Sequence, residues 1–157
     1  MTGKWPVTKI SFFLLALFLI LPASAPRLGS QNKAATLYQR LGGYDRIAAV
    51  VDDFAGRLAS DPQLARFSAG FGTDSRKRRR QLIVDQLCEA AGGPCYYIGR
   101  SMQAAHRGLG ITEADWNAVV KHLVESLDRF QVPQKEKDEL LAIVSGTKAD
   151  ILATASR

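Results

Sequence analysis

Side chains that could build a metal centre or a disulfide network are scarce in this sequence of 157 residues, which has two cysteines and two histidines. Two cysteines without a nearby histidine do not complete the four-ligand shell of a zinc ion. Six prolines and thirteen glycines are too few for a fibrous chain, and no low-complexity tract appears. With 46% hydrophobic and 23% charged residues, the composition is that of one globular domain. The net charge of +6 only weakly indicates a polyanionic partner.

The first 25 residues differ from the rest, and no acidic residue precedes Asp45. Lys4 and Lys9 lie before an apolar run over 10–21, which is shorter than the roughly 20 residues that span a bilayer. A small-x-small site follows over 23–25, as in a secretory signal peptide. Pro26 is an awkward neighbour for cleavage, so an uncleaved anchor stays an alternative. We expect a signal peptide or N-terminal anchor over 1–25, a flexible lead-in over 26–33 and one folded domain over 34–157.

Such a leader predicts an exported protein, periplasmic or otherwise extracytoplasmic, and tethered to the membrane only if the segment is not cleaved. In an oxidising compartment the close pair Cys88 and Cys95 favours a disulfide over a metal site. Two unpaired thiols remain the alternative.

From about residue 34 onward, apolar residues recur at helical spacing and no convincing strand appears. Glycines at 42–43, 92–93, 108 and 110 are placed to end helices. We predict an all-α domain. The expected helices cover 34–40, about 47–58, a turn over 61–66, from Asp74 or Ser75 to about 91, 102–107, 112–130, and one last helix from Pro133 that is weakened at Gly146.

His106 is the candidate ligand for the metal of a prosthetic group. It lies on a short predicted helix between the Gly-Gly-Pro of 92–94 and a glycine at 108. Haem iron takes one axial nitrogen from the protein and leaves its other face to a diatomic gas. A lone helical histidine is more often an ordinary surface or core residue. The other histidine, His122, is expected to face solvent or a seam between helices, and we assign it no role.

From Thr36 to about Leu152 the chain resembles the group I truncated haemoglobins, the two-over-two globins. The resemblance rests on the stretches over 36–44, 50–54 and 92–94, on Val132-Pro133, and on the pattern Tyr97-x-Gly99-x-x-Met102-x-x-x-His106-x-Gly108-x-Gly110-Ile111-Thr112. It implies that 34–157 is a truncated globin domain, a two-over-two helical sandwich around one haem b. It further implies that His106 is the proximal iron ligand, with Tyr97, Met102, Ile111 and Trp116 on the same side. The second ring nitrogen of His106 should donate to a carbonyl, for which the backbone near Met102 is a suitable acceptor.

The distal side departs from the family, because Ala55 stands where a tyrosine commonly follows the phenylalanine. Without that hydroxyl we expect fast oxygen release or easy oxidation, unless Arg79, Gln81 or Gln86 supplies a hydrogen bond. Counted back from Gly92, the register places Arg79, Ile83 and Leu87 on the face toward the haem, and arginines of this helix could pair with its propionates. The cofactor-binding residues expected on this side are Phe54, Phe67, Phe71, Arg79, Leu82, Ile83 and Leu87.

The resemblance implies reversible binding of oxygen, NO or CO, and no nucleic-acid partner. A nitric oxide dioxygenase or other haem redox enzyme is an alternative, but it needs a reductase, and the sequence has no flavin or nicotinamide motif. A peroxidase would lack its distal histidine. An alternative of another class is a cofactor-free helical module that docks on anionic surfaces through the basic run over 76–80.

Overall fold

The computed structural model describes residues 34–152; the expected leader over 1–25 and the lead-in over 26–33 lie outside the described residues. Within the described part, every regular element is helical, which confirms the predicted all-α class. No helix there is long and apolar enough to cross a membrane. The elements are α1 (Leu37–Arg40), α2 (Gly43–Ser60), the 3-10 helix η1 (Ala65–Ser68), α3 (Thr73–Ala90), α4 (Met102–His106), α5 (Glu113–Arg129), α6 (Gln134–Ser145) and α7 (Lys148–Leu152).

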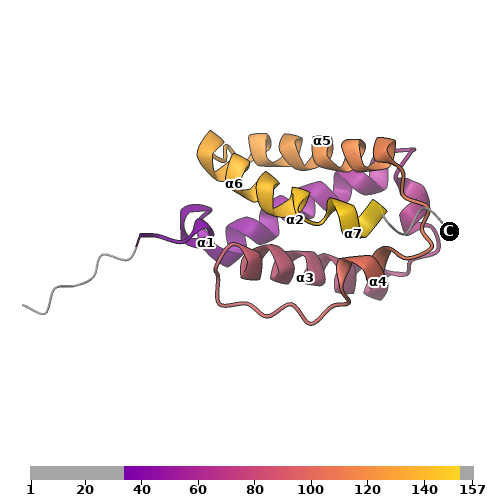
Figure 1. Ribbon diagram of the computed structural model, residues 1–157, viewed down its shortest axis with the longest axis horizontal. Coiled ribbons are helices and arrows are strands. Elements are labelled where there is room, and N and C mark those ends of the chain that lie inside the picture. The colour runs from indigo at the N-terminus through magenta and orange to yellow at the C-terminus, as the bar shows by residue number, and fades with distance from the viewer. Residues whose placement is uncertain (1–33, 153–157) are drawn as a thin grey trace, which may run out of the picture. The chain divides into compact units, whose positions relative to one another are not determined.

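Helix α2 is the centre of the packing, since it contacts α3 on one side and α5 on the other. In Figure 1, α5 runs along one edge of the molecule and α3 with α4 along the opposite edge, with α6 and α7 in front. Helix α4 packs against α7, and α1 packs against α2 and α6. A long connection without helix joins α3 to α4 and loops outward (Figure 1).

The main core lies among α1, α2, α3, α5 and α6, where apolar residues spaced about one turn apart face each other. Val51 and Val84 are fully buried, and Leu127 is 1% exposed. These three residues come from α2, α3 and α5, so one contact region ties the long helices together. At about 25 cal/mol per Å² of apolar surface removed from water, such burial is the main stabilising contribution.

The end of α3 explains the paired glycines at 92 and 93. Gly92 has φ +80°, a left-handed conformation that ends the helix, and the Gly93 amide donates to the Cys88 carbonyl at 2.8 Å. A Cβ on Gly93 would lie 2.5 Å from the Tyr38 ring and 2.7 Å from the Cys88 sulfur. The first glycine supplies the backbone turn and the second lets α1 approach the end of α3.

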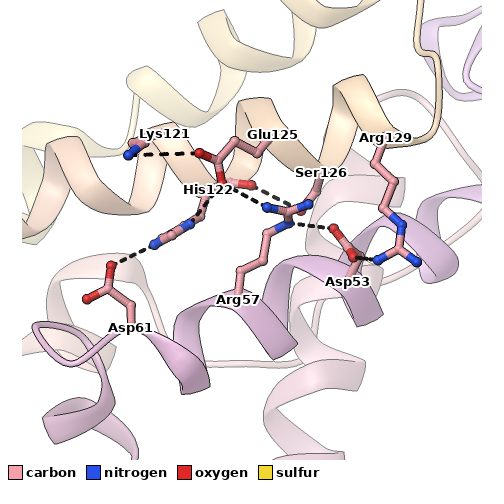
Figure 2. A network of polar contacts seen from close by, with 8 residues as sticks. All are labelled: Asp53, Arg57, Asp61, Lys121, His122, Glu125, Ser126 and Arg129. Carbon is pink, nitrogen blue, oxygen red and sulfur yellow. Dashed lines mark hydrogen bonds and ion pairs between the residues drawn. The ribbon is translucent and has the colours of Figure 1, made fainter.

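A polar network closes the seam between α2 and α5, as Figure 2 shows. His122 Nε2 lies 2.7 Å from an oxygen of Asp61, and His122 Nδ1 lies 3.3 Å from Glu125. Arg57 donates to both Asp53 (2.7 Å) and Glu125 (2.8 Å), which extends the network along the seam. Of the two positions expected for His122, solvent or a seam between helices, the seam is confirmed.

The structure differs from the predicted elements at several helix ends. Helix α1 begins at Leu37 and not at residue 34, and α2 begins at Gly43 and not at about residue 47. The prediction of a single last helix is wrong: α6 ends at Ser145 with Gly146 as its C-cap, and α7 begins at Lys148, because glycine is a poor helix former in an interior position. The turn over 61–66 is a 3-10 helix displaced to Ala65–Ser68. Helix α3 begins at Thr73 with Gly72 as its N-cap, two or three residues before the predicted cap at Asp74 or Ser75, and Gly72 has no side chain that could cap the helix.

Candidate functional site

The short helix α4 presents His106 in a defined orientation. Ser101 caps the helix by accepting a hydrogen bond from the Ala104 amide at 3.2 Å. His106, half-buried at the last position of α4, donates from Nδ1 to the Met102 carbonyl oxygen at 2.8 Å. The carbonyl can only accept, so in the neutral ring the lone pair is on Nε2. The predicted bond to the backbone near Met102 is confirmed.

A second apolar cluster lies next to this helix, and Val144 packs against both this cluster and the main core. Ile111, Trp116 and Ile151 are its buried members, contributed by the segment before α5, by α5 and by α7. Four of the residues predicted for the site belong to this cluster, namely Phe67, Met102, Ile111 and Trp116, and the other members are Val120, Val144, Ile151 and Leu152.

The buried carboxylate of Asp115 fixes the start of α5 and hence the position of Trp116. Asp115 is 1% exposed and accepts hydrogen bonds from Gln63 (2.9 Å), Arg66 (2.7 Å) and both donors of Thr112 (2.9 and 2.8 Å). Burial alone would raise the pKa of Asp115, but these bonds lower it further than burial raises it. This contact ties α5 to the segment that carries Phe67.

The connection from α3 to α4 is anchored by a disulfide between Cys88 and Cys95, whose Cα atoms are 5.8 Å apart. The favoured reading of this cysteine pair is therefore confirmed. Farther along the connection, the Tyr97 hydroxyl donates to the Arg100 carbonyl at 2.7 Å, and burial raises the pKa of Tyr97. Tyr97 therefore braces the connection that leads into α4.

On the other side of α3, a cleft of about 810 Å³ opens between α2, α3 and the segment around η1. Ala55 lines it together with Arg79 and Ile83, so two of the predicted distal residues meet the position where the tyrosine is missing. Arg79 donates to the Ser68 hydroxyl at 2.8 Å and to the Phe67 carbonyl at 3.4 Å. Its guanidinium lies 5.0 Å from the centre of the Phe71 ring, and Phe71 itself does not line the cleft.

Other predicted residues lie elsewhere. Phe54 and Leu87 are buried in the main core. Leu82 is half-buried on α3 and belongs to neither cluster among residues 34–152. Of the two glutamines, Gln81 lines the cleft but donates to Tyr44 and Asp85. Gln86 instead donates to the sulfur of Met102 at 3.3 Å, on the His106 side of α3.

The basic run over 76–80 does not form one exposed face. Arg80 is paired with Asp52 at 2.7 Å, and Arg79 turns toward the segment around η1. Arg76, Lys77 and Arg78 are all exposed, and the first two also line the cleft. This division of the run speaks against a single docking strip for an anionic surface.

The sequence interpretation missed the contribution of the C-terminal helices to the site. Val144, Ile151 and Leu152 belong to the cluster beside α4, but none of them is among the residues that the sequence assigned to the cofactor. They are seven or eight residues apart, the spacing of one helical face, but the break at Gly146 hides the continuity. Within residues 34–152, no group of three or more His, Cys, Asp and Glu side chains could hold a metal ion.

The family model described as bacterial-like globin matches residues 36–153. A group 1 truncated hemoglobin GlbN of Nostoc sp. is 36% identical over 120 residues, which cover 75% of this chain and 98% of the relative. The GlbN of Mycolicibacterium paratuberculosis is 32% identical, covering 74% and 84%. Among solved structures, the 2/2 hemoglobin of Synechococcus sp. PCC 7002 in the cyanomet state, with covalently attached heme, has a TM-score of 0.69 at 30% identity, covering 76% and 99%. Truncated hemoglobin of Tetrahymena pyriformis has a TM-score of 0.69 at 26% identity, covering 75% and 98%.

Proposed function

The chain belongs to the bacterial-like globins and, within them, to the group 1 truncated haemoglobins, and on this premise we propose that it binds one haem b through the imidazole of His106. Its function would be the reversible binding of oxygen or another diatomic gas. When bound, the haem supplies an iron atom with one coordination position for such a gas. Relatives of the chain carry the name hemoglobin, and one solved neighbour holds a covalently attached heme.

The observation that carries the proposal is the hydrogen bond from His106 Nδ1 to the Met102 carbonyl. A histidine that ligates a metal donates its other ring nitrogen to an acceptor, which fixes the tautomer and the ring orientation. Here a backbone carbonyl of the same helix does this, so Nε2 carries the lone pair that a metal requires.

The surroundings of His106 also fit a haem. The neighbouring cluster supplies two aromatic side chains, Phe67 and Trp116, and aliphatic residues from three helices. Such a surface can pack against a porphyrin ring and exclude water from its face. Gln86 holds the sulfur of Met102, and the Asp115 contact holds the backbone before Trp116. Both therefore position residues that would contact the ring.

In the cleft at Ala55, the stabilisation of bound oxygen would depend on Arg79. Ala55 has no hydroxyl group, and Gln81 is already bonded to Tyr44 and Asp85. Arg79 is the donor that remains beside Ala55 and Ile83. A gas ligand that gains negative charge is stabilised by a donor aimed at it, and Ala55 supplies none.

We extend the proposal to export through the segment over 1–25. The Cys88–Cys95 disulfide supports this, since disulfides persist in oxidising compartments. The mass of the protein recovered from its native cells tests it. A chain that begins after Ala25 outside the cytoplasm is expected, or a full-length chain in the membrane if the segment is an anchor. Full-length protein in the cytoplasm would contradict export.

The absorption spectrum of the reduced full chain, with and without carbon monoxide, tests the proposed function. We expect a Soret band that shifts when carbon monoxide is added, because the gas takes the open position. The His106→Ala variant should lose the band or most of its intensity, and His122→Ala, which alters the other histidine, should keep it. A colourless protein that does not take up added hemin, or a His106→Ala variant with an unchanged spectrum, would contradict the proposal.

A further inference from the structure

The connection between α3 and α4 turns two large apolar side chains into solvent. Tyr96 is 81% exposed and Ile98 is 77% exposed, whereas the other exposed large hydrophobic residues among 34–152 are at most 44% exposed. Exposed and half-buried residues alternate over 95–100, so Tyr96, Ile98 and Arg100 share the outward face of this extended segment. Figure 1 shows the connection looping outward past α3. Exposed apolar side chains that are grouped, unlike single ones, mark a surface that binds something.

This outward orientation is held from the inner side of the connection. The disulfide ties Cys95 to Cys88, which is fully buried on α3. The Tyr97 amide donates to the Glu89 carboxylate at 3.3 Å, and the Tyr97 hydroxyl donates to the Arg100 carbonyl at 2.7 Å. The inner positions are therefore bound to α3 or to the connection itself, and the two apolar side chains between them are left facing water. Apolar surface held in water is stabilised when an apolar phase covers it.

The charge of this part of the chain has one sign. Between Glu89 and Glu113 the sequence contains two arginines, Arg100 and Arg107, and no acidic residue. Both arginines are exposed. Of the two flanking carboxylates, Glu89 accepts the amide bond described above, and Glu113 is paired with Lys148 at 2.7 Å. A face that combines apolar side chains with cations is complementary to a bilayer with anionic headgroups.

The connection also starts beside the point at which the described domain begins. A Cβ on Gly92 would lie 3.4 Å from the Cβ of Thr36, so the end of α3 and the start of the domain are in contact. The predicted leader ends at residue 25, and the lead-in over 26–33 can span at most about 30 Å when fully extended. A chain that is anchored through 1–25 would therefore keep the outward face within reach of the bilayer. This position favours a membrane over a protein partner.

We propose that Tyr96, Ile98 and Arg100 dock on the surface of a bilayer that contains anionic lipids. The Tyr96 ring lies at the level of the headgroups, where tyrosine is enriched in membrane proteins, and Ile98 enters the acyl boundary. The Arg100 guanidinium binds a lipid phosphate. Such contact needs no membrane-spanning helix, and residues 34–152 contain none. The docking involves neither the haem nor a gas, so this proposal and the proposed function fail separately.

Hydroxyl-radical footprinting read by mass spectrometry tests the contact on the full chain, because it reports the exposure of single side chains. The full chain is mixed with vesicles of phosphatidylcholine, either alone or with an equal amount of phosphatidylglycerol. We expect the anionic vesicles to lower the oxidation rate of Tyr96 and Ile98 about fivefold, as for side chains that pass from water into the interface, and the neutral vesicles to lower it less. Phe130 follows α5, which runs along the opposite edge of the molecule (Figure 1), and is the internal reference that should not change. A chain that sediments with the vesicles while Tyr96 stays unprotected would overturn the proposal, because it would be tethered through residues 1–25 alone.

Substitutions on the outward face separate its apolar and charged parts, and the readout is the ratio of docked to undocked protein given by Tyr96 protection. Ile98→Ser should lower this ratio about fivefold or more, because the apolar contact is lost. Arg100→Gln should lower it about fivefold with anionic vesicles, the effect of one basic side chain near such a surface. Lys135→Gln removes a charge from an exposed position of α6 and should change it less than about twofold. Circular dichroism checks that each variant is folded, as expected for exposed positions. Unchanged Tyr96 protection in Ile98→Ser, or equal weakening in Arg100→Gln and Lys135→Gln, would overturn the docking face.

Discussion

Replacing Asp115 by asparagine is expected to destabilise the fold at the point where α5 meets the segment around η1. The carboxylate is 1% exposed and accepts from Gln63, Arg66 and Thr112. Asparagine keeps the volume but removes the charge, and its NH₂ group cannot accept the bond from Arg66. The substitution therefore leaves at least one donor at this site without an acceptor.

The loss of stability in Asp115→Asn depends on how well Arg66 is solvated once its carboxylate partner is gone. Removing one partner of a buried ion pair destabilises by about 3–5 kcal/mol, because the remaining charge is buried without compensation. Arg66, however, has a side chain that is 52% exposed, and it can turn to solvent. We therefore expect a loss of about 2–3 kcal/mol in the free energy of unfolding at pH 7, below the usual range for a fully buried pair. The exposed Asp138→Asn is the matched control and should change stability by less than about 0.5 kcal/mol.

The difference between wild type and Asp115→Asn should also depend on pH. The folded-state pKa of Asp115 lies below its ordinary value. Its stabilising contribution is therefore fully present above the unfolded pKa of about 3.9, and it is lost as pH falls through the lowered folded value. Urea unfolding followed by circular dichroism at several pH values measures this. Equal stability of the two proteins at pH 7, or a difference that grows as the solution is acidified, would refute the reasoning.

Three further changes test other parts of the account. Replacing Cys88 and Cys95 by alanine should lower the free energy of unfolding by about 2.5 kcal/mol, the loop-closure value for a separation of 7 residues; equal urea midpoints of the oxidised protein and the variant would contradict this. His122→Phe should raise the pKa of Asp61 toward its ordinary value, because the hydrogen bond from His122 is the main cause that lowers it, and ¹³C NMR of the carboxyl reports the titration. Ala55→Tyr should slow oxygen dissociation in stopped-flow measurements by about tenfold, as one added hydrogen bond of about 1.5 kcal/mol would; an unchanged rate would separate the cleft from the gas site.

The helices and the orientation of His106 could be predicted from the sequence because they depend on local signals. Paired glycines, the Thr112–Asp115 cap and the i, i+4 spacing of Met102 and His106 act within one or two helical turns. The disulfide was favoured because the two cysteines lie only seven positions apart and the leader predicts an oxidising compartment.

The partners of long polar side chains could not be predicted in the same way. Gln86 reaches Met102, and Arg66 reaches Asp115 across 49 positions, because the packing of helices decides which ends meet. For the residues predicted on the distal side of the haem, too, helix packing decided what the sequence could not. The register placed Arg79 and Ile83 on one face, as found, but Leu87 continues that face into the main core, where α2 and α3 pack closely.

The most direct measurement of the central claim is haem binding by His106→Gly with and without added imidazole. The glycine removes the proposed ligand and leaves a space that free imidazole can fill. The account predicts that the variant loses the spectrum of the reduced, carbon monoxide-binding protein and that millimolar imidazole restores it, while His122→Gly needs no rescue. A His106→Gly protein that retains the wild-type spectrum without imidazole would contradict the assignment of His106 as the iron ligand.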